Sequence, residues 1–321
     1  MASTGQPVLA VSGGVGGAKL ALGLADILDP GQLHVLANTG DDFEHYGLHI
    51  SPDIDTLLYT LSGLANEVQG WGVADETFEA LGALGRLGGE TWVQLGDRDL
   101  ATHLWRTHRL REGTGLAQVT AELALTLGIA SHIHPMSDQP VRTTVHSDAG
   151  DLPFQHYFVR ERCEPAVSGF SFEGIEQASA DQEIMSMLGE DAFEAIVICP
   201  SNPWVSIDPI LSLSGVAAAL GASLAPVVLV SPIVGGNAIK GPAAKMMAEL
   251  GVPVTARGVA EHYCTRYPGL VDYFVIDASD ATLAPTMADL SLETVTAETV
   301  MRSREDKQQL ASFVLELAGG R

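Results

Sequence analysis

The sequence VLAVSGGVGGAK (residues 8–19) decides the fold. Its apolar start predicts a buried strand, its glycines predict a turn with almost no side chains, and residues 18–28 have helical spacing. At the helix start of such a unit, backbone N–H groups can approach the oxygens of a phosphate. The candidate phosphate-binding residues of this stretch are Gly13, Gly14, Gly16, Gly17 and Lys19.

This glycine stretch matches neither of the two common nucleotide-binding patterns. It is not G-x-G-x-x-G, and Lys19 is not followed by the Ser or Thr whose hydroxyl holds magnesium in a phosphate loop. A tight strand-to-helix turn without a ligand is therefore an alternative, because glycine adopts positive φ angles readily.

The composition limits the classes of partner. The chain has 321 residues and is 46% hydrophobic, which is enough for one large or two modest domains. Its net charge of −23 makes nucleic acid and anionic membranes poor partners, because both carry phosphates. An acidic enzyme can still bind nucleotides where backbone amides and a divalent cation supply local positive potential.

The three cysteines, Cys163, Cys199 and Cys264, are far apart and form no CxxC pair. This pattern favours a reduced, cytoplasmic setting. The start of the chain has no signal-peptide pattern, and no apolar stretch is long enough to span a bilayer.

Strand-like and helix-like segments alternate, which predicts an α/β fold with a doubly wound, Rossmann-like parallel sheet. We assign residues 1–70 and 190–321 to this core. Residues 71–189 are expected to form an inserted, smaller domain of helices and a β-hairpin. The expected strands lie at 8–12, 33–37, 195–199, 226–230, 252–255 and 273–276, and the expected hairpin pairs 141–147 with 154–160.

Polar clusters follow the expected strands, where the carboxyl edge of the sheet should lie. They occupy residues 13–17, 38–42, 51–56, 201–203 and 231–237. One such cluster is ordinary turn chemistry, but five at corresponding places favour a shared ligand crevice.

Four carboxylates of these clusters, Asp41, Asp42, Asp53 and Asp55, could converge. Adjacent ionised carboxylates repel each other unless a cation joins them, and Mg²⁺ prefers a few oxygens together with phosphate. The alternative is helix capping by Asp53 or Asp55 and Asx-turns at Asp41 and Asp42. As a group they favour metal and substrate binding.

Residues 95–103 (LGDRDLATH) are a second polar cluster, in which the guanidinium of Arg98 could contact an anion or form a surface ion pair. His132 and His134 alternate as strand residues do, so a zinc site from these two alone is not expected. The chain lacks G-x-S-x-G and H-E-x-x-H, which argues against an acyl-enzyme and favours direct transfer between two bound substrates.

Taken together, these segments resemble the 2-phospho-L-lactate transferase family, the CofD/FbiA enzymes of coenzyme F(420) biosynthesis. The resembling segments are SGGVGGAKL, NTGDD, SPDIDT, LGDRDLATH, PMSD, PSNP, SPIVGGNAIKGPAAKMM and GVAEHY, in the family's order over nearly the whole chain. The resemblance implies a homodimer that moves a phospho-acid moiety from a guanylylated donor to the terminal ribityl hydroxyl of the deazaflavin Fo. GMP leaves, and magnesium is the expected metal.

The resemblance also implies roles for single residues. Asp55, the second acid of SPDIDT, matches the family's Fo contact and is the candidate base and a candidate metal ligand. The other candidate metal ligands are Asp41 and Asp42. The remaining candidate binding residues are Asn38, Thr39, Gln94, Asp97, Arg98, Ser201, Asn202, Pro203, Gly235 and Gly236.

Family members use phospholactate, phosphoenolpyruvate or 3-phosphoglycerate as the acid, and the sequence does not choose among them. Two functions of other classes are alternatives. One is a regulatory protein similar to the YvcK-type relatives, which bind a nucleotide sugar; SPDIDT with LGDRD favours the transferase over it. The other is a nicotinamide-dependent oxidoreductase, which the missing G-x-G-x-x-G argues against.

Overall fold

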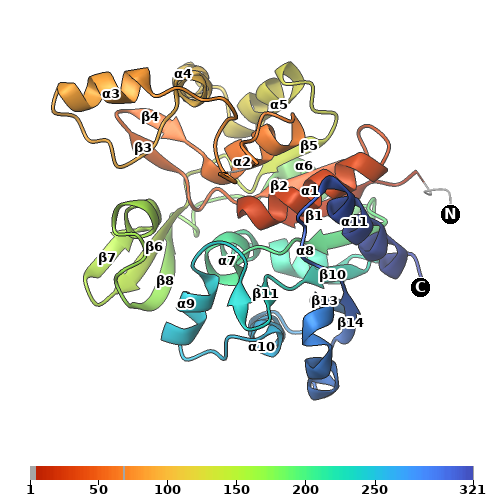
Figure 1. The fold of residues 1–321 in the computed structure, drawn as a ribbon. Helices are drawn as coiled ribbons and strands as arrows, with labels where there is room; N and C mark the ends of the chain where they lie inside the picture. The colour runs from red at the N-terminus through yellow and green to blue at the C-terminus, as the bar shows by residue number, and fades with distance from the viewer. Residues whose placement is uncertain (1–4, 68, 321) are drawn as a thin grey trace.

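A computed structural model describes residues 5–67 and 69–320, and seven parallel strands form the central sheet of this part of the chain (Figure 1). Their order is β14-β13-β10-β9-β1-β2-β5. The strands are β1 (Val8–Ser12), β2 (Leu33–Ala37), β5 (His132–Pro135), β9 (Ala195–Ile198), β10 (Val227–Val230), β13 (Tyr273–Asp277) and β14 (Glu293–Ala297). The expected doubly wound α/β sheet is confirmed.

Helices cover both faces of this sheet, which explains why its inner strands are apolar throughout rather than alternating. Along β1, Val8 and Ala10 face the side covered by α1, α2, α5 and α11, whereas Leu9 and Val11 face α6 to α10. The helices are α1 (Gly14–Ile27), α2 (Pro52–Leu61), α5 (Leu116–Thr126), α6 (Gln182–Gly189), α7 (Asp208–Leu211), α8 (Val216–Ala222), α9 (Ala243–Glu249), α10 (Ala256–Arg266) and α11 (Arg304–Ala318).

The winding direction reverses between β1 and β9. From β1 the chain proceeds outward to β2 and β5, and from β9 it proceeds the other way to β10, β13 and β14. At such a switch point the connections leave the carboxyl ends in opposite directions and open a crevice there. The glycine stretch after β1 and residues 201–203 after β9 both lie at this point.

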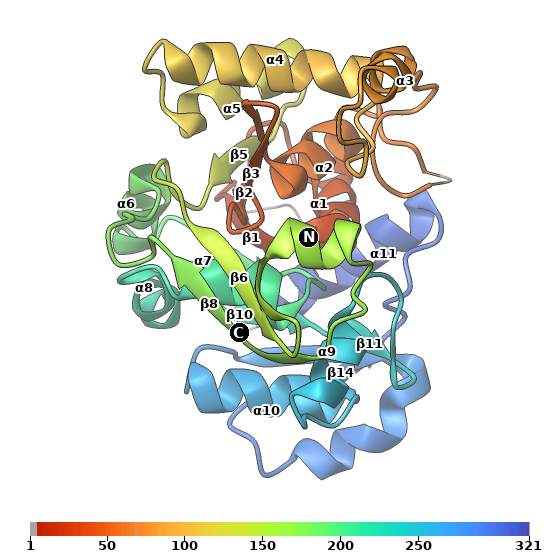
Figure 2. The same cartoon turned by 90° about the vertical axis from the view of Figure 1, so that its left-hand side faces the viewer.

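Smaller elements lie outside the central sheet (Figure 2). The antiparallel pairs are β3 (Phe43–His45) with β4 (Leu48–Ile50), and β11 (Ile233–Val234) with β12 (Asn237–Ala238). A three-stranded sheet has the order β7 (Gly150–Pro153), β6 (Arg142–Ser147), β8 (Val167–Glu173). The remaining helices are α3 (Glu79–Arg86), α4 (Asp97–Arg111), η1 (His156–Arg160), η2 (Pro203–Ile207) and η3 (Ala278–Met287).

The expected hairpin is wrong in its second strand. The partners of β6 are β7 and β8, and residues 156–160 form the π-helical turn η1. The rings of Phe154 and Phe158 stack with centroids 5.5 Å apart, and Tyr157 is buried. Aromatic side chains four residues apart meet on one helical face, so the pattern of this segment fits a helical turn as well as a strand.

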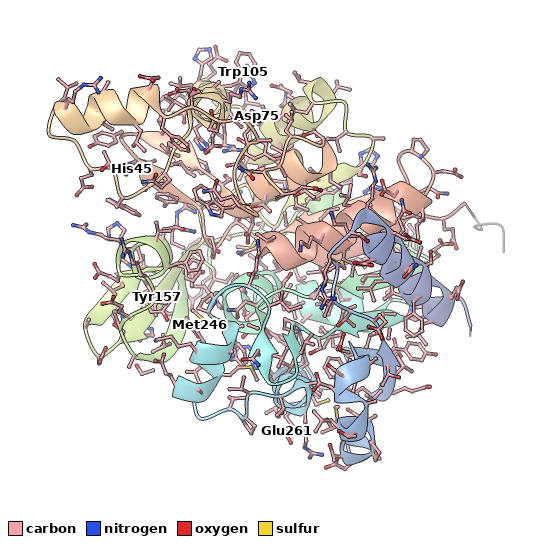
Figure 3. All side chains as sticks on the ribbon, in the orientation of Figure 1. His45, Asp75, Trp105, Tyr157, Met246 and Glu261 are labelled. Carbon is pink, nitrogen blue, oxygen red and sulfur yellow. The ribbon has the colours of Figure 1, made fainter. Side chains whose placement is uncertain are left out.

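Tyr157 and Met246 of α9, both labelled in Figure 3, belong to one buried cluster.

Two further expectations are corrected. Residues 132–135 fall inside the region assigned to the insertion, but they form β5 and pair with β2 at the edge of the central sheet. Residues 252–255 form no strand, because they make the short connection that enters α10 at Ala256. The inserted elements outside the sheet are therefore two separate groups, one on each side of β5 in the chain.

Among the described residues, no single helix is long and apolar enough to cross a membrane. One bent pair, 203–211 with 216–222, meets the criteria of length and composition when the two helices are taken together.

The helix α1 begins at Gly14, so the glycines form its first turn rather than a loop before it. A Cβ atom on Gly16 would collide with the carbonyl oxygen of Pro200, and one on Gly17 would collide with Ser12 Oγ. These two glycines therefore permit close approach of α1 to β1 and to the segment after β9. Gly14 differs, because it has φ +66° and no atom within 4 Å of its Cβ position.

We expect Gly16→Ala to lower the free energy of unfolding by about 1–3 kcal/mol, because the methyl group must displace the Pro200 carbonyl. Gly189→Ala in α6 is the matched control, since no atom lies within 4 Å of its Cβ position. It should change stability by less than about 1 kcal/mol. Chemical denaturation measures both variants. Equal stabilities would show that α1 does not depend on this close approach.

Candidate active site

The carboxylate of Asp53 joins three segments at the switch point. Its Oδ1 accepts a hydrogen bond from the N–H of Gly14 (2.7 Å), and its Oδ2 accepts one from the Asn38 side-chain amide (2.9 Å). The N–H of Gly13 donates to Ser201 Oγ (3.2 Å). The ends of β1, β2 and β9 and the start of α2 therefore meet around one carboxylate.

Asp53 lies in the first turn of α2, yet its partner is the start of α1. A carboxylate is favourable there because the first N–H groups of a helix carry partial positive charge. Gly13 makes this contact possible, since a Cβ atom would lie 2.6 Å from Ser206 Cβ and 2.8 Å from Asp53 Oδ2. Asp53 therefore caps a helix, as the alternative expected, but the helix is α1 rather than α2, in which Asp53 lies.

The next N–H groups of α1 belong to Val15 and Gly16. Helix geometry leaves them without an acceptor in the preceding turn. In the described part of the chain, no hydrogen bond from outside α1 reaches either group. Because the space above Gly14 is open as well, these N–H groups are placed to bind an oxygen of a phosphate.

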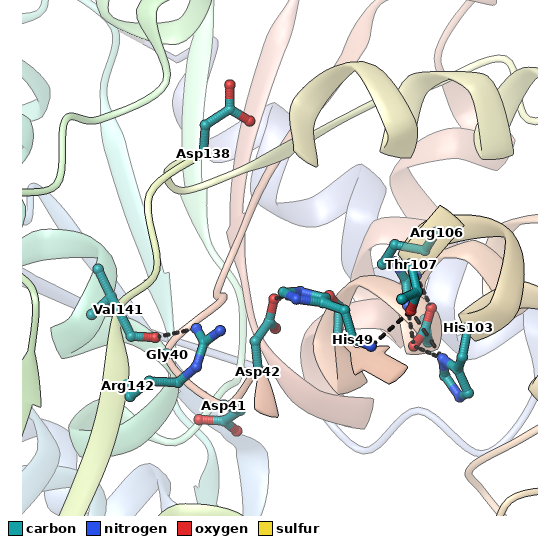
Figure 4. Close-up of polar contacts among 12 residues, drawn as sticks. Gly40, Asp41, Asp42, His49, His103, Arg106, Thr107, Asp138, Val141 and Arg142 are labelled. Carbon is teal, nitrogen blue, oxygen red and sulfur yellow. Dashed lines mark hydrogen bonds and ion pairs between the residues drawn. The ribbon is translucent and has the colours of Figure 1, made fainter. Parts of the chain in front are cut away.

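Asp41 and Asp42 are buried beside this point, after β2. Asp42 Oδ2 accepts a hydrogen bond from Ser51 Oγ (2.8 Å) and lies 3.0 Å from His49 Nε2 (Figure 4). The Oδ1 atoms of both aspartates are buried without a hydrogen-bond partner among the described residues. Such oxygens are costly to bury unless something else satisfies them.

Burial raises the pKa of Asp41 well above its ordinary value, and the charge of Asp53 adds to this. Burial also raises the pKa of Asp53 to about 6, although the hydrogen bonds from Asn38 and Gly14 act against it. A divalent cation would offset the repulsion and satisfy the free Oδ1 atoms. The residues present therefore fit Mg²⁺, which takes carboxylate oxygens together with phosphate oxygens.

Asp55 faces the other side of α2. Arg106 of α4, labelled in Figure 4, is fully buried and donates to both carboxylate oxygens of Asp55, one at 3.2 Å and the other closer still. His103 Nδ1 lies 3.6 Å from Asp55 Oδ2, and His103 Nε2 lies 3.2 Å from Asp99 Oδ1. A metal ion at Asp55 would face the guanidinium charge of Arg106, so the geometry separates Asp55 from the aspartates that fit Mg²⁺.

Several predicted binding residues have other partners. The Lys19 amine donates to the carbonyl of Met301 (3.0 Å) rather than toward the glycine turn. The Asp97 carboxylate accepts hydrogen bonds from Thr77 Oγ1 and from the N–H groups at the start of α3. Arg98 donates to the carbonyl of Ala74 (3.1 Å), and Gln94 is exposed. Asp97 and Arg98 therefore hold local structure around α3, Lys19 holds the connection between β14 and α11, and Gln94 donates to the carbonyl of Thr91.

The clusters after β9 and β10 are also mainly turn chemistry. The Asn202 side chain accepts a hydrogen bond from the N–H of Trp204 and so caps η2, which begins at the buried Pro203. Gly235 and Gly236 connect β11 to β12 with φ +57° and +74°, as a two-residue hairpin turn requires. Of the predicted residues, the structure brings together Gly13, Gly14, Gly16, Gly17, Asn38, Thr39, Asp41, Asp42 and Ser201.

The sequence analysis did not single out Arg106. A signal existed, because Asp99, His103 and Arg106 have spacings of four and three and so share one helical face. It also missed Asp53 as the residue that orients the glycine turn.

A cavity of about 720 Å³ lies apart from the predicted site residues. Its lining includes Trp204, Asp208, His262 and Glu261, the last labelled in Figure 3.

The family described as "2-phospho-L-lactate transferase CofD" matches residues 8–313. The 2-phospho-L-lactate transferase of Methanosarcina acetivorans is 38% identical over 97% of this chain and 98% of its own length. The phosphoenolpyruvate transferase of Mycobacterium ulcerans is 37% identical over 96% of this chain and 97% of its own. A crystal structure of a UPF0052 family protein from Bacillus halodurans has a TM-score of 0.66 at 14% identity, covering 98% of this chain and 100% of that one. This last likeness concerns the fold alone.

We expect the free energy of unfolding of the metal-free protein to fall as the pH rises from about 4 to about 6, because of Asp53. Its pKa rises from 3.8 to about 6 on folding, so over this window the folded protein keeps a proton that the unfolded chain has released. Chemical denaturation of the wild type and of Asp53→Asn across this window isolates the contribution, because the amide cannot ionise. Equal pH slopes for the two proteins would contradict it, and Mg²⁺ should reduce the fall in the wild type.

Arg106→Met is expected to destabilise the fold by about 3–5 kcal/mol, because it leaves Asp55 buried without its counter-ion. The double variant with Asp55→Asn should lose less than the two single variants added together. Arg109→Met, one turn along α4, is the control, since the ion pairs of Arg109 with Glu112 and Glu122 are solvent-accessible and contribute little to stability. Urea denaturation measures the wild type and all four variants, and additive losses would sink the idea of a coupled buried pair.

Proposed function

Because the chain belongs to the 2-phospho-L-lactate transferase CofD family and is a transferase, we propose that it moves a phospho-acid moiety from a guanylylated donor to the terminal hydroxyl of the deazaflavin Fo. GMP is the leaving group, and the product is an intermediate of coenzyme F(420). Relatives named 2-phospho-L-lactate transferase and relatives named phosphoenolpyruvate transferase both match nearly all of the chain. The acid is therefore phospholactate or phosphoenolpyruvate, with 3-phosphoglycerate as a third possibility.

One observation carries the proposal. The N–H groups of α1 that lack an acceptor and the unpartnered oxygens of Asp41 and Asp42 follow β1 and β2, the two strands whose carboxyl ends Asp53 joins. A diphosphate bound there would receive hydrogen bonds from the backbone and share the cation of the aspartates. Phosphoryl transfer depends mainly on such positioning and charge neutralisation, and it needs no covalent nucleophile from the protein.

We assign Asp41 and Asp42 as the residues that hold Mg²⁺, with Asp53 beside them orienting the glycine turn. When bound, the metal supplies positive charge to the diphosphate of the donor. The chain's own residues position the substrates: N–H groups of Val15 and Gly16 bind phosphate oxygens, and burial excludes water from the aspartates.

Asp55 is assigned to the binding of Fo, as the family resemblance implies. Arg106 holds its carboxylate in one rotamer, and His103 lies against the same oxygen. The hydroxyl oxygen of Fo forms a bond to the phosphorus on the phospho-acid side, the bond from that phosphorus to the GMP oxygen breaks, and the hydroxyl proton leaves with the GMP phosphate. Asp55 is not assigned as the base, because Arg106 occupies both of its oxygens on the other side of α2. Asp55 is not assigned as a metal ligand, because the positively charged guanidinium of Arg106 would repel a metal ion there.

The test supplies purified protein with Fo, Mg²⁺ and, one at a time, the guanylylated forms of the three acids. Mass spectrometry of the product and chromatography of GMP measure the reaction. We expect one donor to give product and stoichiometric GMP, and exhaustive chelation to abolish turnover until Mg²⁺ is restored. Binding without turnover for every donor would favour a nucleotide-binding regulatory protein instead.

Asp41→Asn should lower turnover by about 100-fold or more, since even residues behind a metal ligand typically contribute about 10- to 100-fold. Asp29→Asn is the matched control, because Asp29 is exposed in the connection between α1 and β2. Circular dichroism confirms that both variants are folded. Full activity of Asp41→Asn would remove this aspartate from the site.

A further inference from the structure

A second cluster of metal-binding side chains lies away from the candidate active site, on the edge strand of the central sheet. His34 of β2 pairs in register with His132 of β5, and His134 follows two residues later on the same face. Helix α6 covers this face and contributes Glu183 from its first turn. The mechanism proposed above uses none of these residues.

The ligand atoms of this cluster are close together. His34 Nδ1 lies 3.0 Å from His134 Nε2, and the ligand atoms of His34, His134 and Glu183 all lie within 4.8 Å of one another. Bonds of about 2.0–2.2 Å place the ligand atoms of one metal ion at most about 4.4 Å apart. Since Glu183 is exposed and free to adjust, a small movement of its side chain would complete this spacing.

The surroundings of His134 match those of a metal-bound imidazole. Its Nδ1 lies 3.4 Å from Asp181 Oδ1, on the side of the ring away from His34. That oxygen also accepts the N–H of Ile184, so the cap of α6 fixes its position. In metal sites the far nitrogen of a histidine commonly donates to such a carboxylate, which leaves the near nitrogen free of a proton and aimed at the metal.

Two of the three histidines lie in the interior of the protein. His34 and His134 are each 6% exposed. The ring of His132 stacks on His34 with centroids 4.5 Å apart and leaves its own edge exposed beside the cluster.

We propose that His34, His134 and Glu183 bind a transition-metal ion of the zinc class and thereby fasten helix α6 and the edge strand β5 to β2. Two imidazoles with one carboxylate suit Zn²⁺, whereas Mg²⁺ prefers oxygen ligands alone. The two sites of this chain would therefore select different metals. The alternative is a structural hydrogen bond between His34 and His134 that needs no metal.

The experiment uses the untagged, metal-free full chain and no substrates, so its result does not depend on the proposed transferase activity. Zn²⁺ is titrated by calorimetry in saturating Mg²⁺, which occupies the all-oxygen site, and the melting temperature is measured with and without Zn²⁺. We expect one equivalent of Zn²⁺ to bind and to raise the melting temperature. Bound Co²⁺ should show the visible absorption bands of a low-symmetry site with nitrogen ligands.

Glu183→Gln should weaken Zn²⁺ binding by at least about tenfold and reduce the rise in melting temperature, while the metal-free variant keeps wild-type stability because Glu183 is exposed. Glu176→Gln makes the same charge change at an exposed residue nearby and should behave as the wild type. Absence of a Zn²⁺-dependent rise in the wild type, or equal Zn²⁺ affinities for Glu183→Gln and Glu176→Gln, would overturn the proposal and leave the histidine pair as a structural contact.

Discussion

The hydrogen bond from the N–H of Gly14 to the Asp53 carboxylate is the contact on which the site depends. It ties the start of α1 to the start of α2, and the other oxygen of the same carboxylate receives the amide of Asn38 at the end of β2. Because both helices and the strand converge there, the open N–H groups of α1 are fixed in direction before any ligand arrives. Such preorganisation is what phosphoryl transfer requires of a protein.

Two aspartates separated by one residue serve two different networks. Successive positions on an α-helix differ by about 100° around the axis, so residues two apart point to nearly opposite sides. Asp53 therefore faces α1 and the acidic cluster, whereas Asp55 faces α4 and its buried guanidinium. This divergence places positive charge from the protein on one side of α2 and leaves the other side to a metal ion and the backbone of α1.

The acidic character of the chain makes these local sources of positive potential decisive. With a net charge of −23, the surface as a whole repels a diphosphate. In the proposed function, backbone N–H groups and a bound cation attract the diphosphate to the switch point. The chemistry of the ligands also distinguishes the two metal sites proposed here: carboxylate oxygens after β2 for a hard ion, and imidazoles between β2 and β5 for a softer one.

The sequence by itself determined the apolar strands, the doubly wound sheet and the acids after β2, because periodicity and composition report burial and secondary structure directly. Only the tertiary structure decided which partner each side chain meets. Gly16 is required by the carbonyl of Pro200, and Asp55 is occupied by Arg106, both from segments distant in the chain. Asp97 and Lys19 look like ligand residues in a local pattern, but Asp97 holds the start of α3 and Lys19 holds the connection between β14 and α11. Local sequence encodes what an element is, whereas a side chain's role depends on atoms that the fold brings from elsewhere.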